Sequence, residues 1–184
     1  MLSEQGGINA LRFQVEIPLR YGAVHLVGDT TGPGGILKAL LEVPAVFEIA
    51  RCIEDYSPKA LLINFTNPMT PICMAVSLYT KVSVVGLCHG VHHIKRLASK
   101  LLSIDSQEIS VCAGGLNHFT WTTDVVYKGE SVFSALVKEL FNSNKYSIVE
   151  KHPYLIGREL YKVFKVLPTL SDRHFAEFFP YLSY

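Results

Sequence analysis

The stretch VVGLCHGVHH, residues 84–93, gathers side chains that bind transition metals. It contains the thiol of Cys88 and the imidazoles of His89, His92 and His93. Thiolate and neutral imidazole groups bind borderline divalent ions, and substrate oxygens can fill the remaining positions around such an ion. His92 and His93 are adjacent, so on a helix they diverge by about 100° and cannot both face one ion. Both are therefore assigned to an ordinary helix start, and Cys88 is the predicted ligand of this stretch.

Polar side chains also follow the other predicted strands. These strands span 23–29, 60–64, 81–87 and 108–115, and the groups that end them are Asp29, Asn64 and Asn67, Cys88 and His89, and Asn117 and His118. In open α/β sheets, ligands bind outside the carboxyl ends of the parallel strands. His118 ends a strand that can neighbour the strand before Cys88, so Cys88 and His118 are the better predicted pair of metal ligands. For Asn67, which precedes Pro68, a turn that bonds its own backbone is the alternative.

The elements that carry these groups predict an α/β protein. Apolar strands alternate with helical patterns at 36–55, 71–80 and 92–102, which indicates a parallel sheet covered on both faces. Pro44 should divide or kink the first of these helices. After residue 117 the pattern FTWTTDVVY predicts an antiparallel strand, followed by helices at 131–142 and 154–165. We therefore predict one domain over 1–117 and the start of a second over 118–184.

Composition excludes several classes of protein. The 184 residues hold 49% hydrophobic residues and a balanced 17 basic and 16 acidic side chains, which argues against disorder and against a nucleic-acid partner. The longest apolar run, VSVVGLC, is too short to span a bilayer, and the N-terminus lacks the blocks of a signal peptide. The four widely spaced cysteines contain no C-x-x-C pair, which favours reduced thiols in a cytoplasmic protein.

Four motifs together resemble glycoside hydrolase family 4. GDTTGPGGI, INFTNPM, VVGLCHGV and AGGLNHFTW occur in the order and spacing of that family, and RFQVEIPLRYG and LSDRHFAEFFPYL fit its flanking segments. The resemblance implies NAD- and divalent-metal-dependent glycosidases related in fold to lactate and malate dehydrogenases. It assigns 1–117 to the second part of a Rossmann-like NAD-binding domain. It assigns 118–184 to the start of an α+β C-terminal domain for substrate, metal and oligomerisation.

The resemblance also implies an unusual reaction. Most glycosidases place two carboxylates around an oxocarbenium-like state. Members of this family instead oxidise the C3 hydroxyl of the sugar by hydride transfer to NAD, which acidifies the proton at C2. A base removes that proton and the C1 leaving group is eliminated, after which water adds and the hydride returns. The implied cofactors are NAD and Mn²⁺ or another divalent metal.

The resemblance carries over to individual residues of this sequence. The implied roles are metal ligands for Cys88 and His118, substrate binding for Asn67 and Arg12, cofactor binding for Asn64 and Asp29, and a proton-donating or substrate-reading role for His89. Many relatives have a Tyr as the base, and the segment TLSDRHFAEF offers no Tyr before Tyr181, so Asp172 and His174 are the nearest candidates. For Asp172 a helix N-cap, a role that Ser171 could share, is the alternative.

The residues after Cys88 indicate the substrate class. In the family, Cys-His-Gly is typical of enzymes for unphosphorylated sugars and points to α-uronides such as galacturonides or glucuronides. An α-galactosidase or α-glucosidase is the alternative, although α-galactosidases usually have Ser at the position of Gly90. A uronate carboxylate would need a cation, for which Arg12, Arg20 and Arg173 are candidates. The implied partners are a small sugar or oligosaccharide, with no nucleic acid or membrane, and a second copy in a homodimer or homotetramer.

One departure from the family pattern changes the expectation for this chain. No G-x-G-x-x-G-like stretch follows an early strand, so roughly the first hundred residues of a family enzyme, and most of its C-terminal domain, are expected to be absent. One hypothesis is a glycosidase whose cofactor-binding half lies outside this sequence. Another is a catalytically inactive chain that retains metal binding or an interaction surface. A hydroxyacid dehydrogenase of the same superfamily is disfavoured, since those enzymes use a His–Asp pair without a Cys–His metal site.

Overall fold

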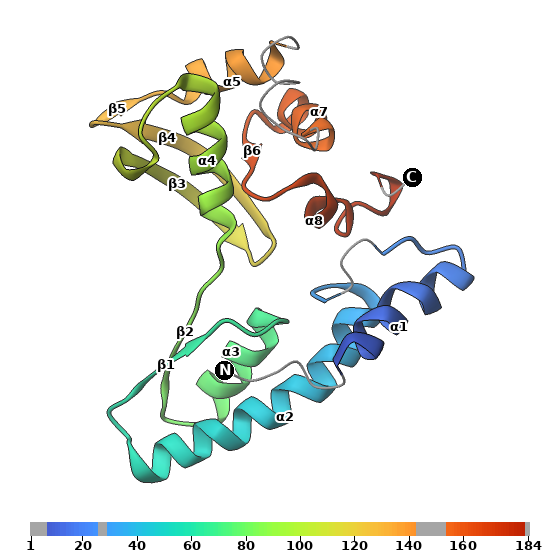
Figure 1. The fold of residues 1–184 in the computed structure, drawn as a ribbon. Coiled ribbons are helices and arrows are strands. Elements are labelled where there is room, and N and C mark those ends of the chain that lie inside the picture. Colours follow the sequence, from blue (N-terminus) through green and yellow to red (C-terminus); the bar gives the residue numbers. More distant parts are fainter. Residues whose placement is uncertain (1–6, 26–28, 143–153, 183–184) are drawn as a thin grey trace. The chain divides into compact units, whose positions relative to one another are not determined.

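The computed structural model describes residues 7–25, 29–142 and 154–182 (Figure 1). The chain forms two compact units. Unit 1 comprises Met1–Cys88 with Glu177–Tyr184, and unit 2 comprises His89–Ala176. The sequence prediction placed the domain change between residues 117 and 118, whereas the compact units change after Cys88.

Unit 1 contains a parallel β-α-β arrangement. Its elements are α1 (Gly7–Arg20), α2 (Gly32–Tyr56), β1 (Leu61–Asn64), α3 (Met69–Tyr79), β2 (Ser83–Gly86) and the short 3₁₀ helix η2 (Pro180–Leu182). Strands β1 and β2 pair in parallel, with Leu61 opposite Ser83 and Asn64 opposite Gly86. The predicted strands at 60–64 and 81–87 and the helix between them are therefore confirmed.

Helix α2 is continuous through Pro44, so the predicted division of this helix is wrong, while the alternative, a kink at Pro44, stays a prediction. Proline removes one backbone donor and costs about 3 kcal/mol in a helix interior. Val46 and Ala50, in the turns that follow Pro44, are buried against Ile72 and Val76 of α3. We infer that this packing offsets the cost of the proline.

The predicted first strand is not confirmed. Residues 23–25 and Asp29 have no strand conformation, and residues 26–28 lie outside the described part of the chain. The segment before them, which carries most of the flanking motif RFQVEIPLRYG, forms α1.

Unit 2 is an antiparallel sheet with helices. Its elements are α4 (Gly90–Leu102), the 3₁₀ helix η1 (Ser106–Glu108), β3 (Ile109–Leu116), β4 (Phe119–Tyr127), β5 (Glu130–Ser131), α5 (Phe133–Phe141), α7 (Leu155–Phe164), β6 (Leu167–Pro168) and α8 (Asp172–Ala176). Strands β3, β5 and β6 all pair antiparallel with β4. The predicted helices at 92–102, 131–142 and 154–165 correspond to α4, α5 and α7.

Strand β3 does not extend the parallel sheet, which corrects the prediction for residues 108–115. It forms a hairpin with β4, in which Leu116 pairs with Phe119 across the turn Asn117–His118. A two-residue turn can join only antiparallel strands, because a parallel partner needs a long crossover connection. The site at His118 is therefore a hairpin turn and not the end of a fourth parallel strand.

A hydrophobic core holds unit 2 together. Helix α4 buries Ile94, Leu97, Ala98 and Leu101 on one face, at the spacing of an amphipathic helix. These side chains pack in one cluster with residues of β3, β4 and α5, namely Ile109, Val125, Leu136 and Leu140. This core supports the hairpin that presents His118.

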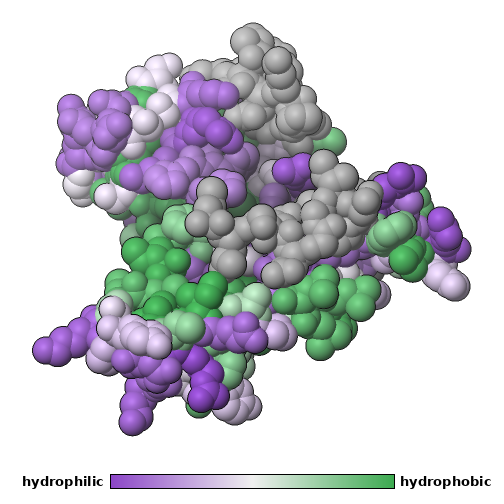
Figure 2. Space-filling model, turned by 60° about the horizontal axis from the view of Figure 1, so that its bottom comes forward, coloured by the Kyte–Doolittle hydropathy of each residue, from purple (hydrophilic) through white to green (hydrophobic). Residues whose placement is uncertain are grey.

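The sheet of unit 1 is covered on one face only within the described residues. Leu61 and Ile63 of β1 are 57% and 52% exposed, and Val85 of β2 is 37% exposed. Successive side chains of a strand point to opposite faces, so these residues share the face away from the α2–α3 core. Hydrophobic residues gather on the surface in the lower part of Figure 2. The predicted cover is therefore confirmed for the face toward α2 and α3, and the opposite face is exposed within the described residues.

No helix in the described ranges combines the length and the apolar composition that a membrane span requires.

Candidate functional site

In unit 1, the loop before α2 meets the loop after β1. Nδ2 of Asn67 donates a hydrogen bond to Oδ2 of Asp29 at 2.9 Å, and the hydroxyl of Thr30 donates to Oδ1 of Asp29 at 2.9 Å. Both oxygens of the Asp29 carboxylate therefore accept hydrogen bonds, and one of these bonds fixes the amide of Asn67. The structure brings together two predicted site residues, one assigned to cofactor and one to substrate.

Asn64 organises the loop that presents Asn67. Its side chain is buried, its Oδ1 accepts from the backbone N–H of Thr66 at 3.1 Å, and its Nδ2 donates to the carbonyl of Thr66 at 3.0 Å. Its own carbonyl accepts from the N–H of Leu87 at 2.9 Å, which ties the end of β1 to the segment after β2. Asn64 thus holds the loop in shape, and its contact with a cofactor stays a prediction.

The stretch VVGLCHGVHH, residues 84–93, lies at the junction between β2 and α4. Cys88 is half-buried in the loop after β2, and His89 is exposed at the N-cap of α4 without a side-chain capping bond. His92 and His93 lie in the first turn of α4, as predicted. The His93 ring lies 6.1 Å from the ring of Tyr154, between centroids.

His118 occupies a strained turn position in unit 2. Its φ is +62°, in the left-handed region that Gly or Asn usually occupies at the second position of a tight turn. A non-glycine residue held there costs about 1–3 kcal/mol, and such strain is concentrated at functional sites. The side chain is only 6% exposed. The turn therefore holds an imidazole where backbone geometry alone favours another residue.

The imidazole of His118 contacts the imidazole of His174 of α8. The ring centroids are 4.8 Å apart and the ring planes are inclined by 79°. The next residues along both segments also pair, since Phe119 packs on Phe175 with centroids 5.1 Å apart. Trp121 packs on Phe175 as well, at 5.0 Å. This aromatic cluster attaches α8 to the start of β4 and holds the two histidines together.

Ser171 fixes the other side of the His174 ring. Its hydroxyl lies 3.0 Å from Nδ1 of His174, and its carbonyl accepts from the backbone N–H of His174 at 3.0 Å. The i, i+3 spacing of Ser171 and His174 was visible in the sequence, but this contact was not predicted.

Asp172 lies beside these residues but bonds to a different helix. Its two carboxylate oxygens accept from the backbone N–H groups of Ile156 and Gly157, both at 2.9 Å, at the first turn of α7. Burial raises the pKa of this carboxyl above its ordinary value, and the N–H groups of α7 lower it in part. The capping alternative for Asp172 is thus observed, at α7 and not at its own helix. A role as the base stays a prediction.

Arg12, the other predicted substrate contact, lies on α1. Its guanidinium Nε is 2.5 Å from a carboxylate oxygen of Glu16 in an exposed i, i+4 pair. An exposed pair of this kind contributes little to stability and can exchange partners.

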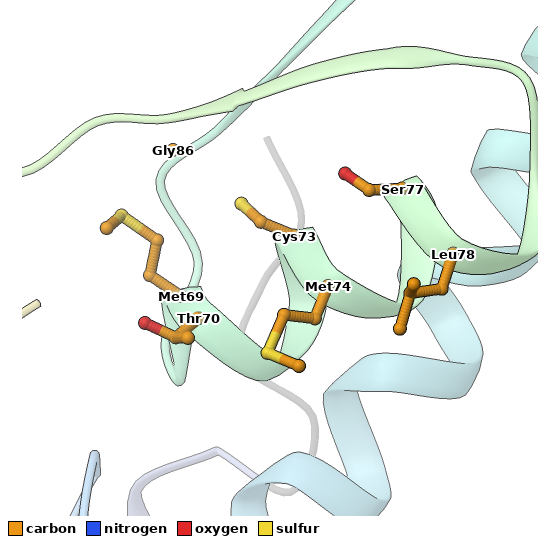
Figure 3. Close-up of a pocket in the computed structure, with 7 residues that line it drawn as sticks. All are labelled: Met69, Thr70, Cys73, Met74, Ser77, Leu78 and Gly86. Atoms are coloured by element: carbon orange, nitrogen blue, oxygen red, sulfur yellow. The ribbon is translucent and has the colours of Figure 1, made fainter. Parts of the chain in front are cut away.

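An open pocket of about 360 Å³ lies along α3 (Figure 3). Six of its lining residues come from α3 and the seventh is Gly86 of β2; they are Met69, Thr70, Cys73, Met74, Ser77, Leu78 and Gly86. Its lining contains no charged group. Burial raises the pKa of the Cys73 thiol, while the hydrogen bond from Asn64 lowers it in part. This lining offers neither an acid–base pair nor an activated thiolate, so we assign no chemistry to it.

The donors in unit 2 suit a divalent metal. No three His, Cys, Asp or Glu side chains of the described residues lie close enough together to form a complete metal site. His118 and His174 nevertheless supply two imidazoles in contact, and Oδ1 of the adjacent Asn117 is buried without a hydrogen-bond partner. A buried acceptor in this state is costly. Nitrogen and oxygen donors of this kind fit a borderline divalent ion.

Sequence comparison now identifies the family. The profile described as Family 4 glycosyl hydrolase matches residues 4–104, and the profile of the family's C-terminal domain matches residues 113–183. The chain belongs to glycosyl hydrolase family 4. Among its relatives is an α-galacturonidase of Bacillus subtilis (strain 168), 32% identical over 95% of this chain and 43% of the relative. An α-galactosidase of the same organism is 33% identical over 90% of this chain and 38% of its own length.

Solved structures share the fold of this family 4 chain. The crystal structure of the Bacillus subtilis protein lplD superposes with a TM-score of 0.83 at 29% identity, over 96% of this chain and 45% of that protein. The 6-phospho-β-glucosidase of Thermotoga maritima, solved with manganese, NAD⁺ and glucose-6-phosphate, superposes with a TM-score of 0.77 at 24% identity, over 100% and 43%. The expected Rossmann-like fold class is confirmed. The chain spans less than half the length of these relatives.

Proposed function

We propose that this chain carries part of the active site of a glycosidase that acts on unphosphorylated α-glycosides, specifically α-uronides such as α-galacturonides. Family membership supports the glycosidase class, and the similarity to an α-galacturonidase over 95% of the chain supports the uronide. The Cys-His-Gly stretch at 88–90 agrees with that class.

The observation that carries the proposal is the environment of His118. A histidine is held at a positive φ, buried, and in contact with a second histidine. Glycine or asparagine would satisfy the turn at less cost, which supports a functional role for the imidazole. We assign His118 and Cys88 as protein ligands of a divalent metal.

The proposed cofactors are NAD and a divalent metal such as Mn²⁺, which the Thermotoga maritima relative contains. When bound, NAD supplies redox chemistry at C3 of the sugar, and the metal supplies Lewis acidity at the neighbouring oxygens. Since the chain covers 43% of its α-galacturonidase relative, the rest of the cofactor site is proposed to come from residues outside this sequence.

The residues of unit 1 are proposed to bind and orient the substrate. The amide of Asn67 is fixed by Asp29, so it can present a donor to a sugar hydroxyl at low entropic cost. Asn64 fixes the conformation of this loop through its two hydrogen bonds with the backbone of Thr66. His89 is exposed directly after Cys88, which suits a group that hands a proton to the leaving group.

A uronate substrate needs a cation for its carboxylate. Of the three arginines named from the sequence, Arg173 is exposed on α8, next to His174 in the chain. Its planar guanidinium suits a bidentate pair with a carboxylate. We assign Arg173 to this role, while Arg12 remains the proposed contact to other substrate atoms.

An α-galactosidase is the second candidate, because the Bacillus subtilis α-galactosidase is 33% identical over 90% of this chain. A neutral galactoside needs no cation at C6. The two candidates therefore differ in whether Arg173 is required.

A chimera tests the proposal. In it, these 184 residues replace the matching residues of the Bacillus subtilis α-galacturonidase, which retains its remaining sequence. With NAD, Mn²⁺ and a thiol reductant, the chimera should release the aryl group from an aryl α-galacturonide, and the unmodified relative serves as the positive control. Turnover of an aryl α-galactoside without turnover of the galacturonide would replace the uronide by the second candidate.

The inactive-chain hypothesis has its own outcome in this experiment. A chimera that folds and binds Mn²⁺ but turns over neither substrate would show that this segment has retained metal binding and lost catalysis. A cytoplasmic location is also proposed, since Cys52, Cys73, Cys88 and Cys112 are all free thiols. The homodimer or homotetramer stays a prediction.

A further inference from the structure

Gly90, at the start of α4, packs against the side chain of Leu170, and both residues belong to unit 2. Gly90 is buried, and a Cβ added to it would lie 3.0 Å from Cγ and 3.1 Å from Cδ2 of Leu170. The φ of Gly90 is not positive, so its lack of a side chain serves this close contact and not a special backbone conformation. Leu170 is only 4% exposed. Its side chain therefore occupies the space that a larger residue at position 90 would need.

The backbone on both sides of Leu170 is attached to other parts of unit 2. The N–H of Thr169 donates to the carbonyl of Thr120 at 2.8 Å, and the two residues before Thr169 form β6 and pair with β4. On the other side, the carbonyl of Ser171 accepts from the N–H of His174 at 3.0 Å. Close-packed interiors transmit a displacement to their neighbours. Leu170 thus gives the first turn of α4 a fixed surface to pack on.

The same turn of α4 carries His89. This residue is the N-cap, with φ −84° and ψ 6°, and its carbonyl accepts from the N–H of His92 at 3.0 Å. Its exposed side chain makes no capping hydrogen bond. The direction of the imidazole therefore depends on the backbone of this turn, which contacts Leu170 at the next residue, Gly90.

We propose that Leu170 is a positioning residue for His89, because its packing on Gly90 fixes the first turn of α4. The inference rests on the proposed function, in which His89 hands a proton to the leaving group. It adds a residue from the segment between β6 and α8 to the groups on which that proton transfer depends. It also gives a steric reason for a glycine at position 90.

A leucine that only fills the core is the alternative. Both explanations predict that Leu170→Ala lowers the stability of the protein, because a buried side chain is truncated. Only the positioning role predicts a loss of turnover that depends on His89 and on the need of the leaving group for a proton. The experiment must measure this dependence.

Steady-state kinetics of the chimera on two α-galacturonides provide the measurement. A nitrophenyl glycoside releases a stable phenolate without protonation, whereas a methyl glycoside releases an alkoxide that needs a proton. The variants are Leu170→Ala, His89→Gln and the two changes together. Leu136→Ala, which truncates an equally buried leucine of the unit 2 core, is the matched control.

Misplacement of the proton donor sets the expected changes. Leu170→Ala should lower kcat on the methyl glycoside by about tenfold or more, with KM nearly unchanged and a much smaller loss on the nitrophenyl glycoside. Leu136→Ala should lower stability without this difference between the substrates. In the His89→Gln background, Leu170→Ala should cause no further loss on the methyl glycoside, because the group that it positions is already absent.

A second pair of variants tests the contact itself and also serves if Leu170→Ala does not fold. Gly90→Ala places a methyl group against Leu170, so it should lower kcat on the methyl glycoside. Leu170→Val, which removes one methylene, should recover most of that loss when it is combined with Gly90→Ala. A double variant that is as impaired as Gly90→Ala, or more so, would show that the packing of these two residues does not set the activity.

The outcomes separate this inference from the proposed function. If His89→Gln loses turnover of the methyl glycoside while Leu170→Ala retains it, or if Leu170→Ala causes the same loss with and without His89, the positioning role is refuted and the proposed function stands. If His89→Gln is as active as the unmodified chimera, or the unmodified chimera turns over neither galacturonide, the proposed function is wrong at this point and the inference fails with it.

Discussion

The amide of Asn67 donates a hydrogen bond to the carboxylate of Asp29 at 2.9 Å, joining two loops whose residues are 38 positions apart. The bond fixes the orientation of an amide that we assign to the substrate. It gives Asp29 a structural reason to affect catalysis without touching the sugar.

Asp29→Ala should weaken substrate binding in the chimera. Loss of a positioning contact of this kind costs about tenfold or more in kcat/KM, because the amide of Asn67 can then rotate away from its productive orientation. Steady-state kinetics on the aryl α-galacturonide measure this effect. Asp55→Ala, at an exposed position near the end of α2, is the control and should leave the kinetics unchanged. Equal kinetics for both variants would show that the Asp29–Asn67 bond does not orient the substrate.

The positive φ of His118 predicts the relative stability of two variants, His118→Gly and His118→Ala. At a φ of +62°, alanine keeps the steric cost of a Cβ, while glycine removes it. His118→Gly should therefore be more stable than His118→Ala by about 1 kcal/mol, although neither variant retains the imidazole. Urea denaturation measures the difference. A more stable alanine variant would contradict the account of the turn.

The contribution of Asp172 to the free energy of unfolding should decrease as the pH rises through the acid range. Its pKa is raised in the folded state by burial, so the native chain binds the proton more tightly than the unfolded chain. Its contribution to stability is then complete below the unfolded pKa and is lost as the pH rises through the higher native pKa.

Comparison with Asp172→Asn isolates this effect. The free energy of unfolding of the unmodified chain, minus that of the variant, should decrease as the pH rises from below the ordinary pKa of an aspartate through the higher native pKa. Denaturant titrations at several pH values provide the measurement. An increase over the same range would mean that the N–H groups of α7 outweigh burial and that the native pKa is lowered.

Arg173 should distinguish the two substrate candidates. Arg173→Lys keeps the charge but loses the bidentate geometry, so it should lower kcat/KM for the α-galacturonide by about tenfold or more. An α-galactoside has no carboxylate and should be affected much less. Arg20→Lys, at an exposed position of α1, is the matched control. An equal loss on both substrates would remove Arg173 from carboxylate recognition.

Local patterns in the sequence predicted most helices and strands but not all of their partners. The apolar spacing of α4, α5 and α7 and the apolar runs of β1 and β2 identified these elements. Nothing in the residues of β3 alone separates a buried parallel strand from one arm of a hairpin. The two-residue turn Asn117–His118 makes β3 one arm of a hairpin. The turn was not predicted, because its positive-φ position is occupied by a histidine, where Gly or Asn is usual.

In the candidate site, too, the residues could be predicted from the sequence but most of their contacts could not. The polar residues after the strands could be found in the sequence, and the structure does bring Asp29 and Asn67 into contact. The contact of Ser171 with His174, and the bond from Asp172 to the start of α7, depend on how α8 packs against β4 and α7. Such contacts are set by tertiary packing, which spacing along the chain does not encode.

The most direct test of the central claim follows the C2 proton. The chimera is allowed to hydrolyse an aryl α-galacturonide in D₂O with NAD and Mn²⁺, and the sugar product is analysed by NMR and mass spectrometry. Oxidation at C3 followed by elimination and addition predicts a solvent deuterium at C2 of the released sugar. Product formed at a normal rate with only hydrogen at C2 would contradict the account, since direct displacement at C1 leaves that bond intact.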